Sequence, residues 1–161
     1  MVVFISPWGS VLHTVEVGAV PDMVTFTPDG RKLLVANEGE PDCYEAAECT
    51  DPEGTVSIID VLPFKPKAKT VRLDSVSLPA EVRVFGPGAT QGQDLEPEYI
   101  ATDAEGTEAW VTLQENNAMA RIDVGRATVT EALDFVIALV LAPPPVVVVG
   151  VAAGLAYLLK R

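Results

Sequence analysis

The residues with the clearest potential for chemistry are the carboxylates of the segment 37–53. This segment, NEGEPDCYEAAECTDPE, holds seven acidic side chains and no basic one. Oxygen-rich loops of this composition suit hard cations such as calcium, which takes about six to eight oxygen ligands. The spacing does not follow the D-x-[DN]-x-[DN]-G pattern of a helix–loop–helix calcium site. Two interpretations therefore stand side by side, a cation site and a solvated acidic loop.

Established catalytic signatures are absent from the sequence. It contains no G-x-S-x-G, no H-E-x-x-H and no G-x-x-x-x-G-K-[ST]. His13 is the only histidine, and it lies in an alternating strand pattern, so a Ser–His or Cys–His pair has no evident base. A carboxylate-only metallophosphoesterase is compatible with the acidic segment, although no nucleophile can be assigned.

The charge balance restricts the kinds of partner. The chain of 161 residues has 23 Asp and Glu against 11 Lys and Arg, a formal net charge of −12. Phosphate recognition needs clustered basic side chains, so we expect no nucleic-acid partner. An acidic balance of this size favours solubility and the attraction of cations.

An internal repeat sets the architecture that must position the acidic residues. The segment 21–37 matches 97–113 at an offset of 76, and GTVSIIDV at 54–61 matches NAMARIDV at 117–124 at an offset of 63. The difference, 76 − 63 = 13, is the length of an insertion carried by the first copy alone. Repeats at a fixed period are typical of modular folds such as propellers and solenoids.

Each copy has the pattern of four short antiparallel strands. Alternating β-branched runs are separated by turn signals such as Pro28-Asp29-Gly30 and Ala104-Glu105-Gly106. The expected strands lie at 24–26, 32–36, 55–61 and 69–73 in the first copy, at 98–102, 109–113, 118–124 and 128–132 in the second, and at 2–6 and 10–17 before them. A further strand is possible at 81–85 (EVRVF). Four-stranded antiparallel units of this kind describe propeller blades.

The predicted fold class is all-β, a partial β-propeller with an apolar C-terminal tail. We expect a propeller fragment over 1–133, made of a half-blade at 1–20 and blades at 21–75 and 96–133, followed by the tail at 134–161. A closed propeller has about four to eight blades, so this chain is expected to be a piece of a larger ring. Trp8, Phe26, Tyr99 and Trp110 are expected to pack within or between blades.

The repeat also predicts where the acidic residues meet. In a blade, the loop after the second strand and the loop before the first strand lie on the same face. Carboxylates of the first blade should therefore face those of the second, with calcium as the expected cofactor. The predicted metal ligands are Glu38, Glu40, Asp42, Glu96, Glu98 and Glu115.

The two cysteines, Cys43 and Cys49, enclose five residues within the acidic segment. We predict a disulfide between them, which implies an oxidising compartment. Two unpaired thiols are the alternative.

The tail is uncharged from 135 to 159 and is followed by Lys160-Arg161. Twenty-five apolar residues can cross a bilayer, and a basic end fits the positive-inside tendency, so membrane association through 135–159 is predicted. The three prolines at 143–145 interrupt a helix there, and the β-branched run at 146–149 offers a strand as the alternative.

The repeats also resemble a known family. Four segments are similar to segments of the choice-of-anchor I family. They read VGAVPDMVTFTPDGRKLLVANEGEP, DPEGTVSIID, LPAEVRVFGPGA and QDLEPEYIATDAEGTEAWVTLQENNAMARID. Its members are bacterial extracellular or surface-anchored propeller proteins, related to YVTN repeats and often labelled alkaline-phosphatase-like. The similarity covers about residues 2–133. It implies an exported propeller and no secure enzymatic activity.

The expected function is therefore that of a non-catalytic extracellular or cell-surface module. It would bind an extracellular ligand or protein through its acidic loop face. A metal-dependent phosphoesterase at the same face is the competing hypothesis. Because the sequence departs from the family after Leu133, a truncated gene product without independent function is a third.

Overall fold

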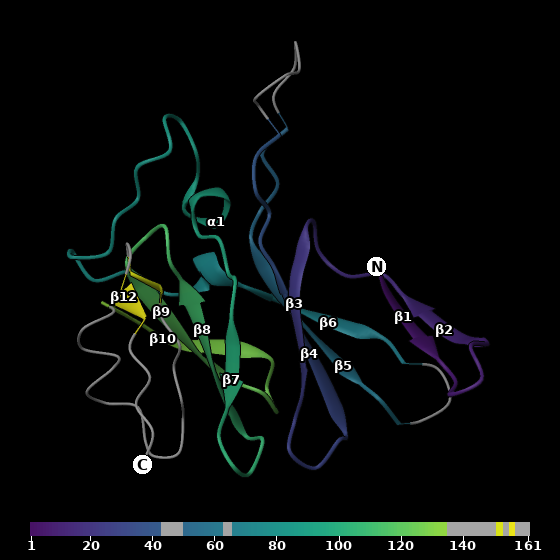
Figure 1. Cartoon of the computed structure of the whole chain (residues 1–161). Helices are drawn as coiled ribbons and strands as arrows, with labels where there is room; N and C mark the ends of the chain where they lie inside the picture. The colour runs from purple at the N-terminus through teal and green to yellow at the C-terminus, as the bar shows by residue number, and fades with distance from the viewer. Residues whose placement is uncertain (43–49, 63–65, 135–150, 153–154, 157–161) are drawn as a thin grey trace.

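The computed structural model describes residues 1–42, 50–62, 66–134, 151–152 and 155–156 (Figure 1). The predicted disulfide between Cys43 and Cys49 lies outside these residues, as does nearly all of the predicted membrane segment 135–159. Within the described part of the chain, no helix is long and apolar enough to cross a membrane.

The fold is all-β, as predicted, and its sheets are antiparallel meanders. A two-stranded sheet comes first and is followed by two four-stranded sheets in the orders β3-β4-β5-β6 and β10-β9-β8-β7. The strands are β1 (Val2–Ile5), β2 (Val11–Val15), β3 (Pro21–Phe26), β4 (Lys32–Asn37), β5 (Thr55–Asp60), β6 (Ala68–Arg72), β7 (Ile100–Thr102), β8 (Glu108–Leu113), β9 (Ala118–Asp123), β10 (Thr128–Asp134), β11 (Val151–Ala152) and β12 (Leu155–Ala156). Two short helical segments, η1 (Leu73–Ser75) and α1 (Gln91–Asp94), join the four-stranded sheets. This architecture is that of partial propeller blades.

The repeat is visible in the strand register. Lys32 of β4 pairs with Asp60 of β5, and Glu108 of β8 pairs with Asp123 of β9. The two sequence offsets convert the first pair into the second, because 32 + 76 = 108 and 60 + 63 = 123. The extra 13 residues therefore lengthen the loop between β4 and β5 without changing the sheet.

The core lies between the stacked sheets (Figure 1). Because side chains alternate across a pleated strand, β4 and β5 supply apolar residues to both neighbours. Leu34 and Ile58 pack against the second blade, with Ile122 as one partner. Leu33 and Ile59 face the β1–β2 hairpin instead. The blade at the centre is thus covered on both faces.

Two expectations from the sequence are wrong. Residues 81–85 form no strand: 81 and 82 lie in a turn and bend, 83–85 are irregular, and only Val82 of this segment is buried. Trp110 is buried as expected, whereas Trp8, Phe26 and Tyr99 are 89%, 54% and 48% exposed. Trp8 lies in the β1–β2 turn, and Phe26 lies on the more exposed face of β3, so neither packs against a neighbouring sheet.

Candidate functional site

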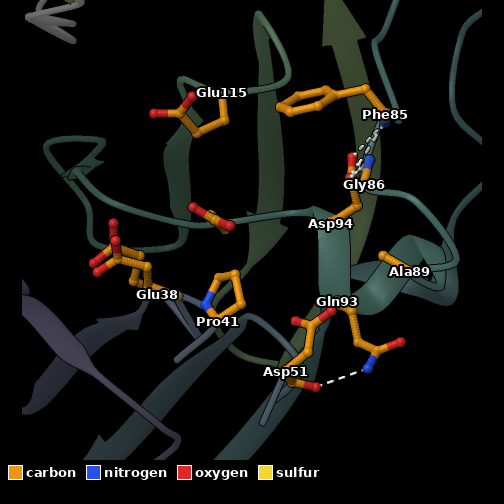
Figure 2. Close-up of a pocket in the computed structure, with 11 residues that line it drawn as sticks. Glu38, Pro41, Asp51, Phe85, Gly86, Ala89, Gln93, Asp94 and Glu115 are labelled. Carbon is orange, nitrogen blue, oxygen red and sulfur yellow. Dashed lines mark hydrogen bonds between the residues drawn. The ribbon is translucent and has the colours of Figure 1, made fainter. Parts of the chain in front are cut away.

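A pocket of about 320 Å³ lies where the β4–β5 loop, α1 and the β8–β9 turn meet (Figure 2). Three segments supply its wall: the β4–β5 loop, the segment that leads through α1 to β7, and the turn after β8. Its lining residues are Glu38, Glu40, Pro41, Asp51, Phe85, Gly86, Ala89, Gln93, Asp94, Glu96 and Glu115. Of the described residues around it, six are acidic and none is basic.

The structure brings four of the six predicted metal ligands to this pocket. Glu38 and Glu40 enter from the end of β4, Glu96 from the segment before β7, and Glu115 from the turn after β8. The blades are adjacent, so residues almost sixty positions apart in the chain share one cavity. The predicted gathering of acidic residues from both blades is therefore present in the structure, while metal binding by them stays a prediction.

The other two predicted ligands lie outside the pocket wall. Glu98 is half-buried beside it, and its carboxylate accepts a hydrogen bond from the side-chain amide of Gln114. Asp42 is exposed and forms an isolated β-bridge with Thr50 further along the loop, where its backbone N–H donates to the Thr50 carbonyl at 2.9 Å. Asp42 is the predicted ligand that the structure least supports.

Partial burial and mutual repulsion raise the pKa of three carboxyl groups in or beside the pocket. Partial burial, together with the charges of Glu38, Glu115, Glu40 and Asp94, raises the pKa of Glu96 to about 7. Two further pKa values are raised. Burial, then the charges of Glu38, Glu115 and Asp22, raise the pKa of Glu98 to about 7. Burial and the neighbouring carboxylates also raise the pKa of Glu38.

Asp94 has a structural role in the pocket, because its hydrogen bonds hold the pocket wall together. This side chain is 7% exposed, and its carboxylate accepts hydrogen bonds from the backbone N–H groups of Phe85 and Gly86 and from Nδ2 of Asn116. The distances from Asp94 to Gly86 N and to Asn116 Nδ2 are 2.5 and 2.9 Å. Because these donors already occupy its oxygens, Asp94 fixes the 85–86 loop to the second blade.

A second set of contacts fixes the acidic loop to α1. Gln93 donates from Nε2 to the carbonyl of Asp51 at 2.7 Å, the contact drawn in Figure 2. Gly54 N donates to the carbonyl of Gly92 at 2.9 Å. Arg72 holds Glu53 through a salt bridge of 2.5 Å, so this carboxylate of the acidic segment is already neutralised.

The ligand set predicted from the sequence did not include Asp51, Gln93 and Asp94, although Asp51 belongs to the acidic segment 37–53 and Asp94 precedes the second blade together with Glu96. Their contacts run from α1 to the acidic loop and to Asn116, and α1 has no counterpart in the first copy of the repeat. The repeat register therefore gave no signal for these contacts. The Thr90–Gln93 capping box, in which both reciprocal hydrogen bonds form, is a local sequence signal that could have located α1.

The raised pKa values predict how stability depends on pH. A carboxyl that binds its proton more tightly in the folded state contributes stability below its unfolded pKa of 4.5, and this is lost as pH rises through the folded value of about 7. Since Glu96 and Glu98 are partly exposed, solvent screening reduces the effect, and we expect the free energy of unfolding to fall by about 1 kcal/mol between pH 5 and pH 8. Urea unfolding at both pH values measures it. A Glu96→Gln Glu98→Gln variant should lose this fall, and an unchanged fall in that variant would contradict the assignment.

Glu38, Glu40, Glu96 and Glu115 are the residues that could hold a hard cation, since all four are carboxylates at one pocket. Among the described residues, no three acidic, cysteine or histidine side chains are already arranged around a common metal position. A bound cation would thus require rotation of these side chains, of which Glu40 and Glu115 are exposed.

Comparison with known proteins gives a family and weak structural likenesses. A solved structure described as Kuenenia stuttgartiensis hydrazine synthase is similar to this chain with 18% sequence identity and a TM-score of 0.43. The match covers 83% of this chain and 31% of that chain, and similarity at this level indicates neither a shared activity nor a shared ligand. No curated protein matches the chain. The family model described as choice-of-anchor I domain matches residues 2–139, and the chain therefore belongs to the choice-of-anchor I domain family.

Proposed function

We propose that the chain is a non-catalytic module of the cell surface or extracellular space that binds calcium at the acidic pocket and an extracellular ligand or protein through the same face. Membership of a choice-of-anchor family supports the surface location and the non-catalytic role. The observation that carries the binding proposal is the convergence of Glu38, Glu96 and Glu115 from two consecutive blades on one pocket.

Calcium fits the pocket better than a smaller ion does. Glu side chains can bind calcium through one or both oxygens, and calcium tolerates irregular geometry completed by water. Magnesium demands near-octahedral geometry and releases its water reluctantly. The exposed Glu40 and Glu115 can adjust to the larger ion. Its charge would offset the repulsion that, after burial, raises the pKa of Glu38 and Glu96.

Calcium should stabilise the folded chain measurably. Extracellular calcium modules bind with dissociation constants of about 0.1 to 1 mM, so about 5 mM calcium at pH 8 is expected to raise the melting temperature by about 3 to 5 °C. Glu96→Gln should raise the melting temperature without calcium, because it relieves repulsion, and should reduce the calcium shift. Glu105→Gln, in the exposed β7–β8 turn, is the matched control and should retain the full shift. Equal shifts in both variants would contradict the proposal.

An enzymatic role of the same pocket has one observation in its favour. Carboxyls with pKa values of about 7, such as Glu96 and Glu98, suit general acid–base catalysis near neutral pH. Hydrolysis of p-nitrophenyl phosphate with and without calcium separates the two functions. The binding module predicts no turnover above the uncatalysed rate. Calcium-dependent turnover that is lost in Glu96→Gln would replace it with a phosphoesterase.

A further inference from the structure

The peptide bond between Asp51 and Pro52 is the only aspartate–proline bond in the chain. It lies in the β4–β5 loop, where Asp51 lines the acidic pocket. An aspartate side chain can reach its own main-chain carbonyl carbon and close a five-membered ring, and such an intramolecular attack has a high effective concentration. The nitrogen of a proline is that of a tertiary amide, and it leaves as a secondary amine. A nucleophile and a favourable leaving group are therefore joined at this bond.

The carboxyl group of Asp51 is available for this attack. Its Oδ1 is buried, and no donor in the described part of the chain forms a hydrogen bond to it. A buried polar atom without a partner keeps the cost of its desolvation, and no hydrogen bond has to break before Oδ1 attacks. Glu53, two residues along the same loop, is instead held in a salt bridge by Arg72.

The main-chain carbonyl of Asp51 is polarised by a fixed donor. Nε2 of Gln93 donates to this oxygen at 2.7 Å (Figure 2). The Gln93 amide is held in this orientation because its Oε1 accepts hydrogen bonds from the backbone N–H and the hydroxyl of Thr90, at 3.0 and 2.9 Å. A preorganised donor on a carbonyl oxygen stabilises the negative charge that develops there when the carbon is attacked. Gln93 is therefore placed to act as an oxyanion donor for Asp51.

We propose that the bond between Asp51 and Pro52 is a self-cleavage site, at which the folded loop accelerates hydrolysis of the chain. A carboxyl oxygen of Asp51 bonds to the Asp51 carbonyl carbon while Gln93 stabilises the oxyanion. The bond from that carbon to the nitrogen of Pro52 then breaks, and the nitrogen takes the proton of the carboxyl group. The product on Asp51 is a cyclic anhydride. Asp51 is only partly buried, so water reaches the anhydride and hydrolyses it to a C-terminal aspartate, with Pro52 as a new amino terminus.

The two pieces stay together after the break. The strands β4 and β5 lie on either side of it and remain paired from Lys32–Asp60 to Asn37–Thr55. Both strands are largely buried in the central blade. The pieces 1–51 and 52–161 therefore form one particle and separate only under denaturing conditions.

Intact-mass spectrometry of the full chain kept at pH 5 without calcium measures the reaction, because acid supplies the proton that the leaving nitrogen needs. We expect the fragments 1–51 and 52–161, formed at least about tenfold faster in the folded chain than in the chain unfolded by urea. Size-exclusion chromatography of the cleaved sample should show an unchanged elution volume. Asp51→Ala, which removes the nucleophile, should give neither fragment.

Gln93→Glu tests the positioning role of the donor. It keeps an oxygen that accepts from Thr90 and replaces Nε2 with a second oxygen, so cleavage of the folded variant should slow at least about tenfold. In urea the variant and the unaltered chain should be cleaved at the same rate. Gln91→Glu is the matched control, since it makes the same change in α1, where Nε2 of Gln91 donates to the Val76 carbonyl instead, and it should be cleaved as the unaltered chain is.

Two results would overturn the proposal. One is a folded chain that stays intact at pH 5 or is cleaved no faster than the urea-unfolded chain, since the fold would then contribute nothing to the reaction. The other is equal cleavage of the unaltered chain and of Gln93→Glu, with circular dichroism showing that both are folded.

Discussion

Replacing Gly54 with alanine is expected to lower the free energy of unfolding by about 3 kcal/mol. A Cβ at this position would lie 1.9 Å from the carbonyl oxygen of Leu95 and 2.7 Å from Cδ of Pro97. The Leu95 carbonyl is backbone, and Leu95 itself is 1% exposed, so relief requires movement of the chain segment that enters the second blade. The same movement would break the hydrogen bond from Gly54 N to the Gly92 carbonyl.

Equilibrium urea unfolding measures this change. Gly125→Ala is the matched control, because the nearest atom to its Cβ would be Oδ1 of Asp123 at 3.4 Å, an ordinary contact. We expect the control to change stability by less than about 1 kcal/mol. If Gly54→Ala and Gly125→Ala unfold at the same urea concentration, the close approach of Gly54 to the Leu95 carbonyl would be refuted.

Replacing Asp94 with alanine is expected to cost a comparable amount, about 3 kcal/mol. The change leaves the backbone N–H groups of Phe85 and Gly86 and the buried Nδ2 of Asn116 without this acceptor. Asn116 is 0% exposed, and its Nδ2 keeps the carbonyls of Arg83 and Asp94 as acceptors, so most of the loss falls on the two backbone N–H groups. Asp94→Asn retains one acceptor oxygen and should lose about half as much.

Asp94→Ala should loosen the loop around residues 85–86 in addition to lowering the free energy of unfolding. Hydrogen exchange of a peptide covering residues 82–90 should accelerate in Asp94→Ala, because the carboxylate fixes this loop, while peptides from β3 and β4 should keep their protection. Glu81→Ala removes an exposed carboxylate near the same loop and is expected to leave both stability and exchange unchanged. Equal exchange in Asp94→Ala and Glu81→Ala would refute the scaffold role of Asp94.

The strands were predictable because two periodic signals agree. Alternation identified the hairpins, and the repeat assigned the same register to both blades, as the pairs Lys32–Asp60 and Glu108–Asp123 show. The segment 81–85 misled because EVRVF alternates like a strand, yet the structure gives it no pairing strand. A strand needs a partner edge as well as a favourable composition, and the sequence does not specify that partner.

The acidic pocket was partly predictable for the same reason. Glu38 and Glu96 follow from the repeat, since loops in equivalent positions share a face. The hydrogen bonds of Asp51 and Asp94 depend on the path of a connection that occurs once in the chain, and no periodic pattern predicts that path. The exposure of Trp8 and Phe26 likewise depends on which sheet faces have neighbours.

Calorimetric titration of calcium into the full chain at pH 8 is the most direct test of the cation site. We predict saturable binding with a dissociation constant of about 0.1 to 1 mM, abolished in Glu38→Gln Glu96→Gln and retained in Glu105→Gln. Absence of binding heat in the unaltered chain, or the same heat in the double variant, would contradict the account.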